Sequence, residues 1–310
     1  RATDAIALLE PLLADLERVL GAEHPDTLAS RGNLASAYQA ARRSDDALAI
    51  FEPLLADRER ILGADHPDTL VSRANLAGAY QAAQRTGAAI AIYEPLLADH
   101  KRTLGAEHPS TLNTRANLAN AYQDAGRSDE AIALLEPLLA GHERTLGAEH
   151  STTLNTRNNL ANAYQDAGRT ADAIAILEPL LADRERVLGS EHANTLRTSN
   201  NLAIVYLDAG RVDDAIAILE PLLADLERTL GAEHPDTLGA RNNLANAYEA
   251  AGRDADAERL RAAAAGASFA AGDGAAGASL FNVGEQAQDG PALFDVGDDT
   301  RDGSSQYDVE

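Results

Sequence analysis

The chain has no cysteine, methionine or tryptophan, and Lys101 is its only lysine. Without cysteine it forms no disulfides and has no thiolate for catalysis or metal binding. No apolar run approaches the roughly 20 residues that a membrane-spanning helix needs. The sequence therefore predicts no disulfides and no membrane as partner.

Basic residues are few against the acids, and the net charge is −23 over 310 residues. An excess of carboxylates repels phosphate backbones and anionic lipid surfaces, so nucleic acid is not an expected partner. No nucleotide-binding loop and no Ser-His-Asp arrangement is apparent in the sequence. We expect a protein that is not an enzyme and has no cofactor. The heavy use of Ala, Gly, Asp and Arg hints at a bacterial source.

What is present is a repeat of 42 residues, marked by a histidine that recurs at that interval. A fixed period of this size indicates a solenoid of stacked structural units. Ligands of one metal ion must converge on it, and residues one helix-pair layer apart lie too far from each other, so we interpret these histidines as loop-packing residues rather than metal ligands. The recurring histidines are His24, His66, His108, His150, His192 and His234.

The sequence of each unit predicts two helices. In the first full unit they run from about Pro25 to Ala41 and from about Ser44 to Leu62. Gly126 and the glycines at the equivalent positions of later repeats can adopt the left-handed backbone conformation that ends the first helix. Arg43 and Arg85 are interpreted as departures from that glycine pattern. Serine or threonine at the start of the second helix (Ser44, Ser128 and Thr170) predicts a side-chain N-cap. A proline in every second helix predicts a kink that repeats along the convex side.

The motif Asn159-Leu-Ala-Asn-Ala-Tyr164, with Gly168 and Ala173, resembles the tetratricopeptide repeat. The 42-residue unit, with Leu-Gly-x-Glu-His-Pro-x-Thr-Leu between helix pairs, is similar to the kinesin-light-chain type. The resemblance implies an all-α, right-handed superhelical solenoid of antiparallel helix pairs over residues 1–265, in about six repeats that start in mid-repeat. It also implies a concave groove, lined by the first helices, that binds extended peptides.

Asparagines form a stripe along the first helices, because residues such as Asn113, Asn117 and Asn120 are spaced i, i+4 and i+7. An asparagine amide both donates and accepts, so such a stripe can bind a peptide backbone without reading its side chains. The same chemistry could instead bond neighbouring helices and fix their stacking. The full candidate set is Asn33, Asn75, Asn113, Asn117, Asn120, Asn155, Asn159, Asn162, Asn201, Asn243 and Asn246.

Arginines precede these asparagines in five repeats, and Ser199 interrupts the series. They could contact an acidic ligand, but pairing with loop glutamates such as Glu107 and Glu149 is the preferred interpretation. The arginines are Arg31, Arg73, Arg115, Arg157 and Arg241.

Residues 266–310 form an acidic, low-complexity tail whose composition predicts disorder. Within it, Leu280-Phe-Asn-Val-Gly284 returns as Leu293-Phe-Asp-Val-Gly297. The apolar residues of these two segments are either docking elements or a chance duplication. They are Leu280, Phe281, Val283, Leu293, Phe294 and Val296.

The sequence thus predicts an interaction scaffold that binds a protein or peptide, with the tail as one candidate ligand, docking in cis or on a neighbour. The alternative is a structural protein whose copies assemble head to tail into a filament, because nearly identical repeats could stack across copies. The scaffold would be cytoplasmic by default, and the filament would be extracellular.

Overall fold

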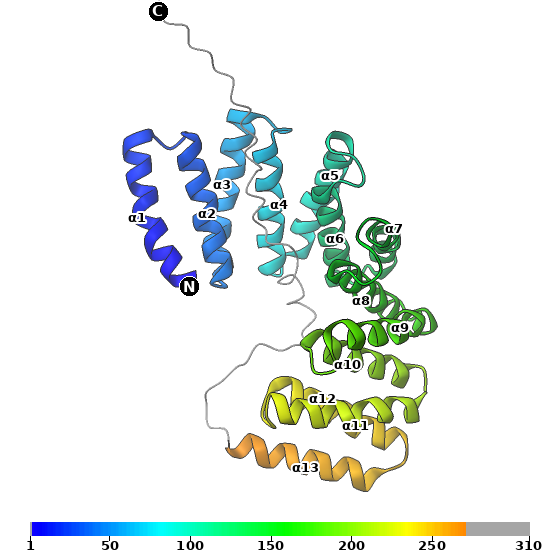
Figure 1. Ribbon diagram of the computed structural model, residues 1–310. Helices are drawn as coiled ribbons and strands as arrows, with labels where there is room; N and C mark the ends of the chain where they lie inside the picture. Colours follow the sequence, from blue (N-terminus) through cyan, green and yellow to red (C-terminus); the bar gives the residue numbers. More distant parts are fainter. Residues whose placement is uncertain (1, 271–310) are drawn as a thin grey trace, which may run out of the picture.

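The computed structural model describes residues 2–270, and the regular secondary structure of that part is entirely helical (Figure 1). The tail segments around Phe281 and Phe294 lie outside the described residues, and the division at residue 265 stays a prediction. The helices are α1 (Ala2–Leu20), α2 (Pro25–Ala40), α3 (Ser44–Leu62), α4 (Pro67–Ala82), α5 (Thr86–Thr103), α6 (Pro109–Asp124), α7 (Ser128–Leu146), α8 (Ser151–Asp166), α9 (Thr170–Leu188), α10 (Ala193–Asp208), α11 (Val212–Thr229), α12 (Pro235–Ala250) and α13 (Asp254–Ala270).

Consecutive helices pack against each other along the whole stack, and each even-numbered helix also contacts the next even-numbered one. Between residues 2 and 270, no two odd-numbered helices come equally close. Neighbours lie closest on the inside of a curve, so the even-numbered first helices form the inner layer and the odd-numbered second helices the outer one. Figure 1 shows the stack turning from the upright α1–α4 to the crosswise α10–α13. The fold is the predicted all-α superhelical solenoid.

The core repeats with the sequence, because the same positions are buried in each unit. One leucine of the second helix packs against the first helix of its own repeat, as Leu54 does beside Gly32. Its equivalents in α5, α7, α9 and α11 are at most 3% exposed, whereas Leu12 of α1, with no helix before it in the described residues, is 48% exposed. Packing against the first helix of the same repeat therefore buries this leucine. The buried equivalents are Leu96, Leu138, Leu180 and Leu222.

The recurring histidines begin the first helices, which is a more specific role than the loop packing predicted for them. His24 has an extended backbone, and its Nδ1 accepts a hydrogen bond from the backbone N–H of Asp26 at 3.2 Å. The same bond, at 3.2–3.3 Å, opens every later first helix. It satisfies one of the backbone donors that the first turn of a helix leaves free.

The first helices end one residue earlier than predicted, with Ala41 as the C-cap of α2. Gly126 then takes φ +70, and the next amide, that of Arg127, donates back to Tyr122 O at 2.8 Å. In the first two full repeats the left-handed residue is Arg42 or Gln84, with φ of +59 and +58.

The prediction that Arg43 and Arg85 replace the helix-ending glycine was therefore wrong by one position. Both arginines correspond to Arg127, and the substituted glycine positions are those of Arg42 and Gln84.

The predicted N-caps of the second helices were also wrong. Ser44, Ser128 and Thr170 are already the first helical residues, and the capping positions are the preceding arginines, such as Arg43, which make no side-chain cap bond. The helices also run continuously through their internal prolines, for example Pro137 in α7. The kink attributed to the prolines stays a prediction.

Candidate functional site

All of the candidate asparagines lie on first helices, and therefore in the inner layer of the stack. Asn33, Asn113 and Asn246 are exposed, Asn162 is buried, and the others are half-buried. The structure thus places the predicted set along one layer, from α2 to α12.

Several of these asparagines bond to each other across neighbouring first helices. Asn159 Nδ2 lies 3.4 Å from Asn120 Oδ1, and Asn201 Nδ2 donates to Asn162 Oδ1 at 3.1 Å. Asn243 Nδ2 donates to Asn200 Oδ1 at 3.0 Å. Each bond links one repeat to the next, so these amides contribute to stacking, as the second interpretation of the stripe predicted.

Other members of the set bond to other side chains. Asn155 Oδ1 accepts from Arg184 at 2.8 Å, Asn246 Oδ1 accepts from Arg261 at 3.0 Å, and Asn117 is hydrogen-bonded with the buried Tyr93.

Three members, Asn33, Asn75 and Asn113, make no hydrogen bond with the residues that the structure describes. They lie toward the N-terminal half of the stack, on α2, α4 and α6. Their amides retain both a donor and an acceptor for a ligand.

Carboxylates accompany the asparagines on the inner layer. Asp124 accepts a hydrogen bond from Gln81 at 2.6 Å, and Asp208 accepts one from Gln165 at 2.9 Å, each across two neighbouring first helices. Burial raises the pKa of Asp166, and a hydrogen bond with Gln123 partly offsets that shift. The inner layer therefore combines amides with carboxylates, which disfavours contact with acidic side chains of a ligand but not with its backbone.

A tyrosine near the end of each first helix connects to the second helix before it. Tyr164 Oη donates to Glu136 Oε1 at 2.7 Å, and Tyr206 donates to Glu178 at 2.7 Å. Burial, followed by the bond to the glutamate, raises the pKa of both tyrosines to about 12. The bond recurs at every first helix, so it fixes how each first helix lies on the outer layer. The tyrosines are Tyr38, Tyr80, Tyr122, Tyr164, Tyr206 and Tyr248.

An arginine covers five of these six rings. The Arg169 guanidinium lies 4.3 Å from the centroid of the Tyr164 ring, and it also donates to Asp172, three residues on, at 2.7 Å. Arg85, beside Tyr80, has Ala88 in place of that acid and reaches Asp45 instead, at 3.2 Å. The acid therefore holds the guanidinium over the ring.

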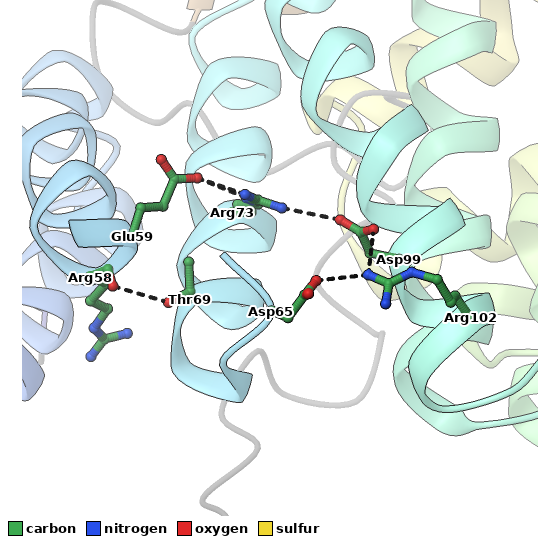
Figure 2. Close-up of polar contacts among 7 residues, drawn as sticks. All are labelled: Arg58, Glu59, Asp65, Thr69, Arg73, Asp99 and Arg102. Atoms are coloured by element: carbon green, nitrogen blue, oxygen red, sulfur yellow. Dashed lines mark hydrogen bonds and ion pairs between the residues drawn. The ribbon is translucent and has the colours of Figure 1, made fainter. Parts of the chain in front are cut away.

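The arginine series is engaged in ion pairs, as predicted, but the predicted partners were wrong. Figure 2 shows Arg73 between Glu59 at 2.7 Å and Asp99 at 3.2 Å, which lie on the second helices before and after it. The loop acid Asp65 pairs instead with Arg102, at 2.7 Å, and Arg102 also contacts Asp99. Partners 14 and 26 residues away come together only because the helices stack.

The same pairing recurs in three more repeats. Arg31 pairs with Asp57, Arg157 pairs with Glu143 and Asp183, and Arg241 pairs with Glu227, all within 2.9 Å. The predicted loop partners, Glu107 and Glu149, pair with Arg144 and Arg186. Arg115 is the exception, and it makes no ion pair or hydrogen bond with the described residues.

A column of buried polar pairs links second helices to the first helices that follow them, and sequence reasoning missed it. His142 Nδ1 lies 3.0 Å from Thr156 Oγ1, and His100 lies at the same distance from Thr114. Burial is the main cause that lowers the pKa of both histidines. One repeat further on, Arg184 donates to Thr198 at 2.6 Å, and burial lowers its pKa to about 9. Aligning the repeats from α3 onward would have shown Arg or His at the first position with Ser or Thr at the second in four repeats, and Leu226 with Ala240 in the fifth.

No group of three or more His, Asp or Glu side chains within the described part of the chain is arranged to hold a metal ion. Across the same residues, no helix has the length and apolar character that a membrane crossing requires.

Comparison with known proteins identifies the fold. Two sequence models of the tetratricopeptide repeat match residues 74–144, 110–178, 152–223 and 198–264, and residues 1–26 and 27–68. A putative kinesin light chain of Podosopora anserina, with nearly identical TPR-like repeats, is 36% identical, with a TM-score of 0.60 over 66% of this chain and 97% of that one. No curated protein matches.

More distant solved structures share the fold. BtubC (BKLC) of P. vanneervenii is 20% identical, with a TM-score of 0.62 over 76% of this chain and 94% of that one. The apo form of RapI is 12% identical, with a TM-score of 0.62 over 87% of this chain and 92% of that one. With family matches spanning nearly all of residues 1–264, the chain belongs to the tetratricopeptide-repeat family.

Proposed function

We propose that the protein is a non-enzymatic scaffold that binds an extended peptide segment along its inner layer, mainly through the peptide's backbone. The observation that carries the proposal is the line of asparagines on consecutive first helices, of which Asn33, Asn75 and Asn113 have no partner among the described residues. Their spacing of one amide per repeat suits a ligand that runs across the helices. Family membership supports an interaction scaffold in general terms.

The asparagines divide into those that bond to a neighbouring first helix and those that do not, and this division allows ligand binding to be tested apart from helix stacking. Asn159 and Asn201 bridge neighbouring helices, so their substitution weakens both the stack and the groove. Asn33, Asn75 and Asn113 make no such bond, so alanine at these positions removes ligand contacts while leaving the helix contacts in place. The triple variant of the second class is therefore the sharper test.

The test uses a fluorescein-labelled peptide of residues 278–299 and a chain that ends at Ala270, where α13 ends. Three amide bonds to a peptide backbone contribute about 1 kcal/mol each, so their loss weakens binding by about 100-fold. We expect that loss in the triple variant, with an unchanged unfolding midpoint. Asn194→Ala, on α10 but outside the stripe, is the matched control.

Wild-type affinity in the triple variant would exclude the asparagines as the binding contact. If the 278–299 peptide does not bind, the tail is not the ligand. In that case a library of extended peptides, screened on the same two variants, decides whether the groove binds peptides at all.

The alternative, a head-to-tail filament, is favoured by the apolar surface of α1, where Leu8 is 73% exposed. Light scattering with negative-stain microscopy tests the filament directly: fibres of the full chain that vanish when the tail is removed would establish it, and monomers would exclude it.

A further inference from the structure

In three repeats, an aspartate of the second helix lies between two arginines. Asp99 contacts Arg73 at 3.2 Å and Arg102 at 3.1 Å (Figure 2). One carboxylate thus connects an arginine of the inner layer with an arginine on the aspartate's own helix.

The same arrangement occurs in two other repeats. Asp57 lies 2.8 Å from Arg31 and 3.3 Å from Arg60. Asp183 lies 2.9 Å from Arg157 and 2.7 Å from Arg186. Three repeats therefore place a carboxylate of their own between these two arginines. We call this position the carboxylate seat.

In the α6–α7 repeat the arginines remain but the carboxylate is absent. Arg115 and Arg144 occupy the two arginine positions, and Gly141 stands where the aspartate would be. The second acid is missing as well, because Lys101 stands where Glu59 pairs with Arg73 in the preceding repeat. Both substitutions remove negative charge from the same arginine.

Arg115 is only 8% exposed and has neither a hydrogen bond nor an ion pair with the described residues. The Arg115 guanidinium therefore has no carboxylate partner of its own, whereas the equivalent arginines Arg73 and Arg157 each pair with two carboxylates. Arg115 lies two residues from both Asn113 and Asn117. At about 100° per residue it therefore points away from the asparagine stripe, toward the outer layer.

We propose that Arg115, Arg144 and Lys101 form a binding site for a carboxylate, seated over Gly141 and separate from the peptide groove. The ligand group takes the place that Asp99 and Asp183 fill in the neighbouring repeats. Glu107 lies beside the seat, because a Cβ atom added at Gly141 would stand 3.4 Å from Oε2 of Glu107. The Glu107 carboxylate pairs with Arg144 at 2.7 Å. That nearby negative charge favours a monoanionic carboxylate over a dianionic phosphate.

The carboxylate could come from a small acid or from an acidic side chain of a peptide, and two probes distinguish these sources. The full chain is titrated with sodium acetate and, separately, with acetyl-Gly-Asp-Gly-amide, while the arginine Nε–Hε resonances are followed by NMR. Sodium chloride at matched ionic strength and acetyl-Gly-Asn-Gly-amide are the controls. We expect saturable shifts of Arg115 and Arg144 with carboxylates only. Tighter binding of acetate identifies a small acid as the ligand, and tighter binding of the peptide identifies an acidic side chain.

Two variants at one position complete the test. Gly141→Asp fills the seat from within and should weaken binding at least tenfold, whereas Gly141→Ala leaves the seat open and should change affinity less than threefold. Gly141→Asp should also unfold at a higher temperature than Gly141→Ala, although aspartate is the poorer helix former. Unchanged binding in Gly141→Asp, or no saturable shift of Arg115 with either carboxylate probe, would overturn the proposal.

Discussion

Packing of each second helix against the first helix before it stabilises this fold, and one pair of substitutions tests that statement quantitatively. Leu12 and Leu138 occupy the same repeat position on second helices, but Leu138 is 0% exposed and Leu12 is 48% exposed. The difference arises because the first helix α6 covers Leu138, whereas no helix precedes α1 in the described residues.

Leu138→Ala removes a fully buried side chain and leaves a cavity between α6 and α7. Such substitutions cost about 3–4 kcal/mol. Leu12→Ala removes a half-exposed side chain with no enclosed space around it, so only part of the transfer free energy of leucine is lost. We expect about 1 kcal/mol or less for that change.

Urea unfolding followed by far-UV circular dichroism measures both variants against the wild type, with the midpoint as the readout and the slope as a check on cooperativity. Hydrogen exchange of α6 and α7 shows whether the interior variant loosens its own junction. Equal destabilisation by the two substitutions would refute the statement that burial between adjacent helices, rather than the helix itself, stabilises the fold.

Three further predictions concern the backbone, a buried amide and pH. Gln84 adopts φ +58 where later repeats have glycine, so Gln84→Gly should stabilise the chain by about 0.5–1 kcal/mol in thermal unfolding. Asn158 is buried with both amide atoms unpaired, and Ala116 holds the same repeat position, so Asn158→Ala should stabilise by about 1 kcal/mol in urea unfolding. His100 and His142 have pKa values lowered by burial. Their contribution to stability is complete above the unfolded pKa of about 6.5 and is lost as the pH falls through the folded pKa. Replacing the His142–Thr156 pair by Leu and Ala, which reproduces the natural Leu226–Ala240 pair, should reduce the loss of stability between about pH 7.5 and 5.5.

Sequence alone predicted the elements of this fold well, because the 42-residue period fixes where every helix begins and ends. It failed at the caps. Histidine is not among the preferred N-cap residues, so the role of His24 could not be inferred from propensity. Serine near the start of a second helix could be either the N-cap or the first helical residue. Only the backbone angles of Arg43 show that Arg43 is the N-cap and Ser44 the first helical residue.

The candidate site was predicted only in outline. Helical spacing places Asn113, Asn117 and Asn120 on one stripe, but it cannot show that Asn120 bonds to Asn159 one repeat further along. Pairings between residues 14, 26 or 39 apart depend on how the helices stack. The exception is the glycine at position 141, whose departure from aspartate is visible when the repeats are aligned and was overlooked.

The central proposal is that the inner layer binds an extended peptide through asparagine amides, and the side-chain amide resonances of those asparagines report on it directly. We would titrate the ¹⁵N-labelled chain ending at Ala270 with the 278–299 peptide and follow these resonances by NMR. The account predicts saturable shifts on consecutive first helices, largest at Asn33, Asn75 and Asn113. A saturating peptide that shifts resonances of the outer helices and leaves these three unchanged would contradict it.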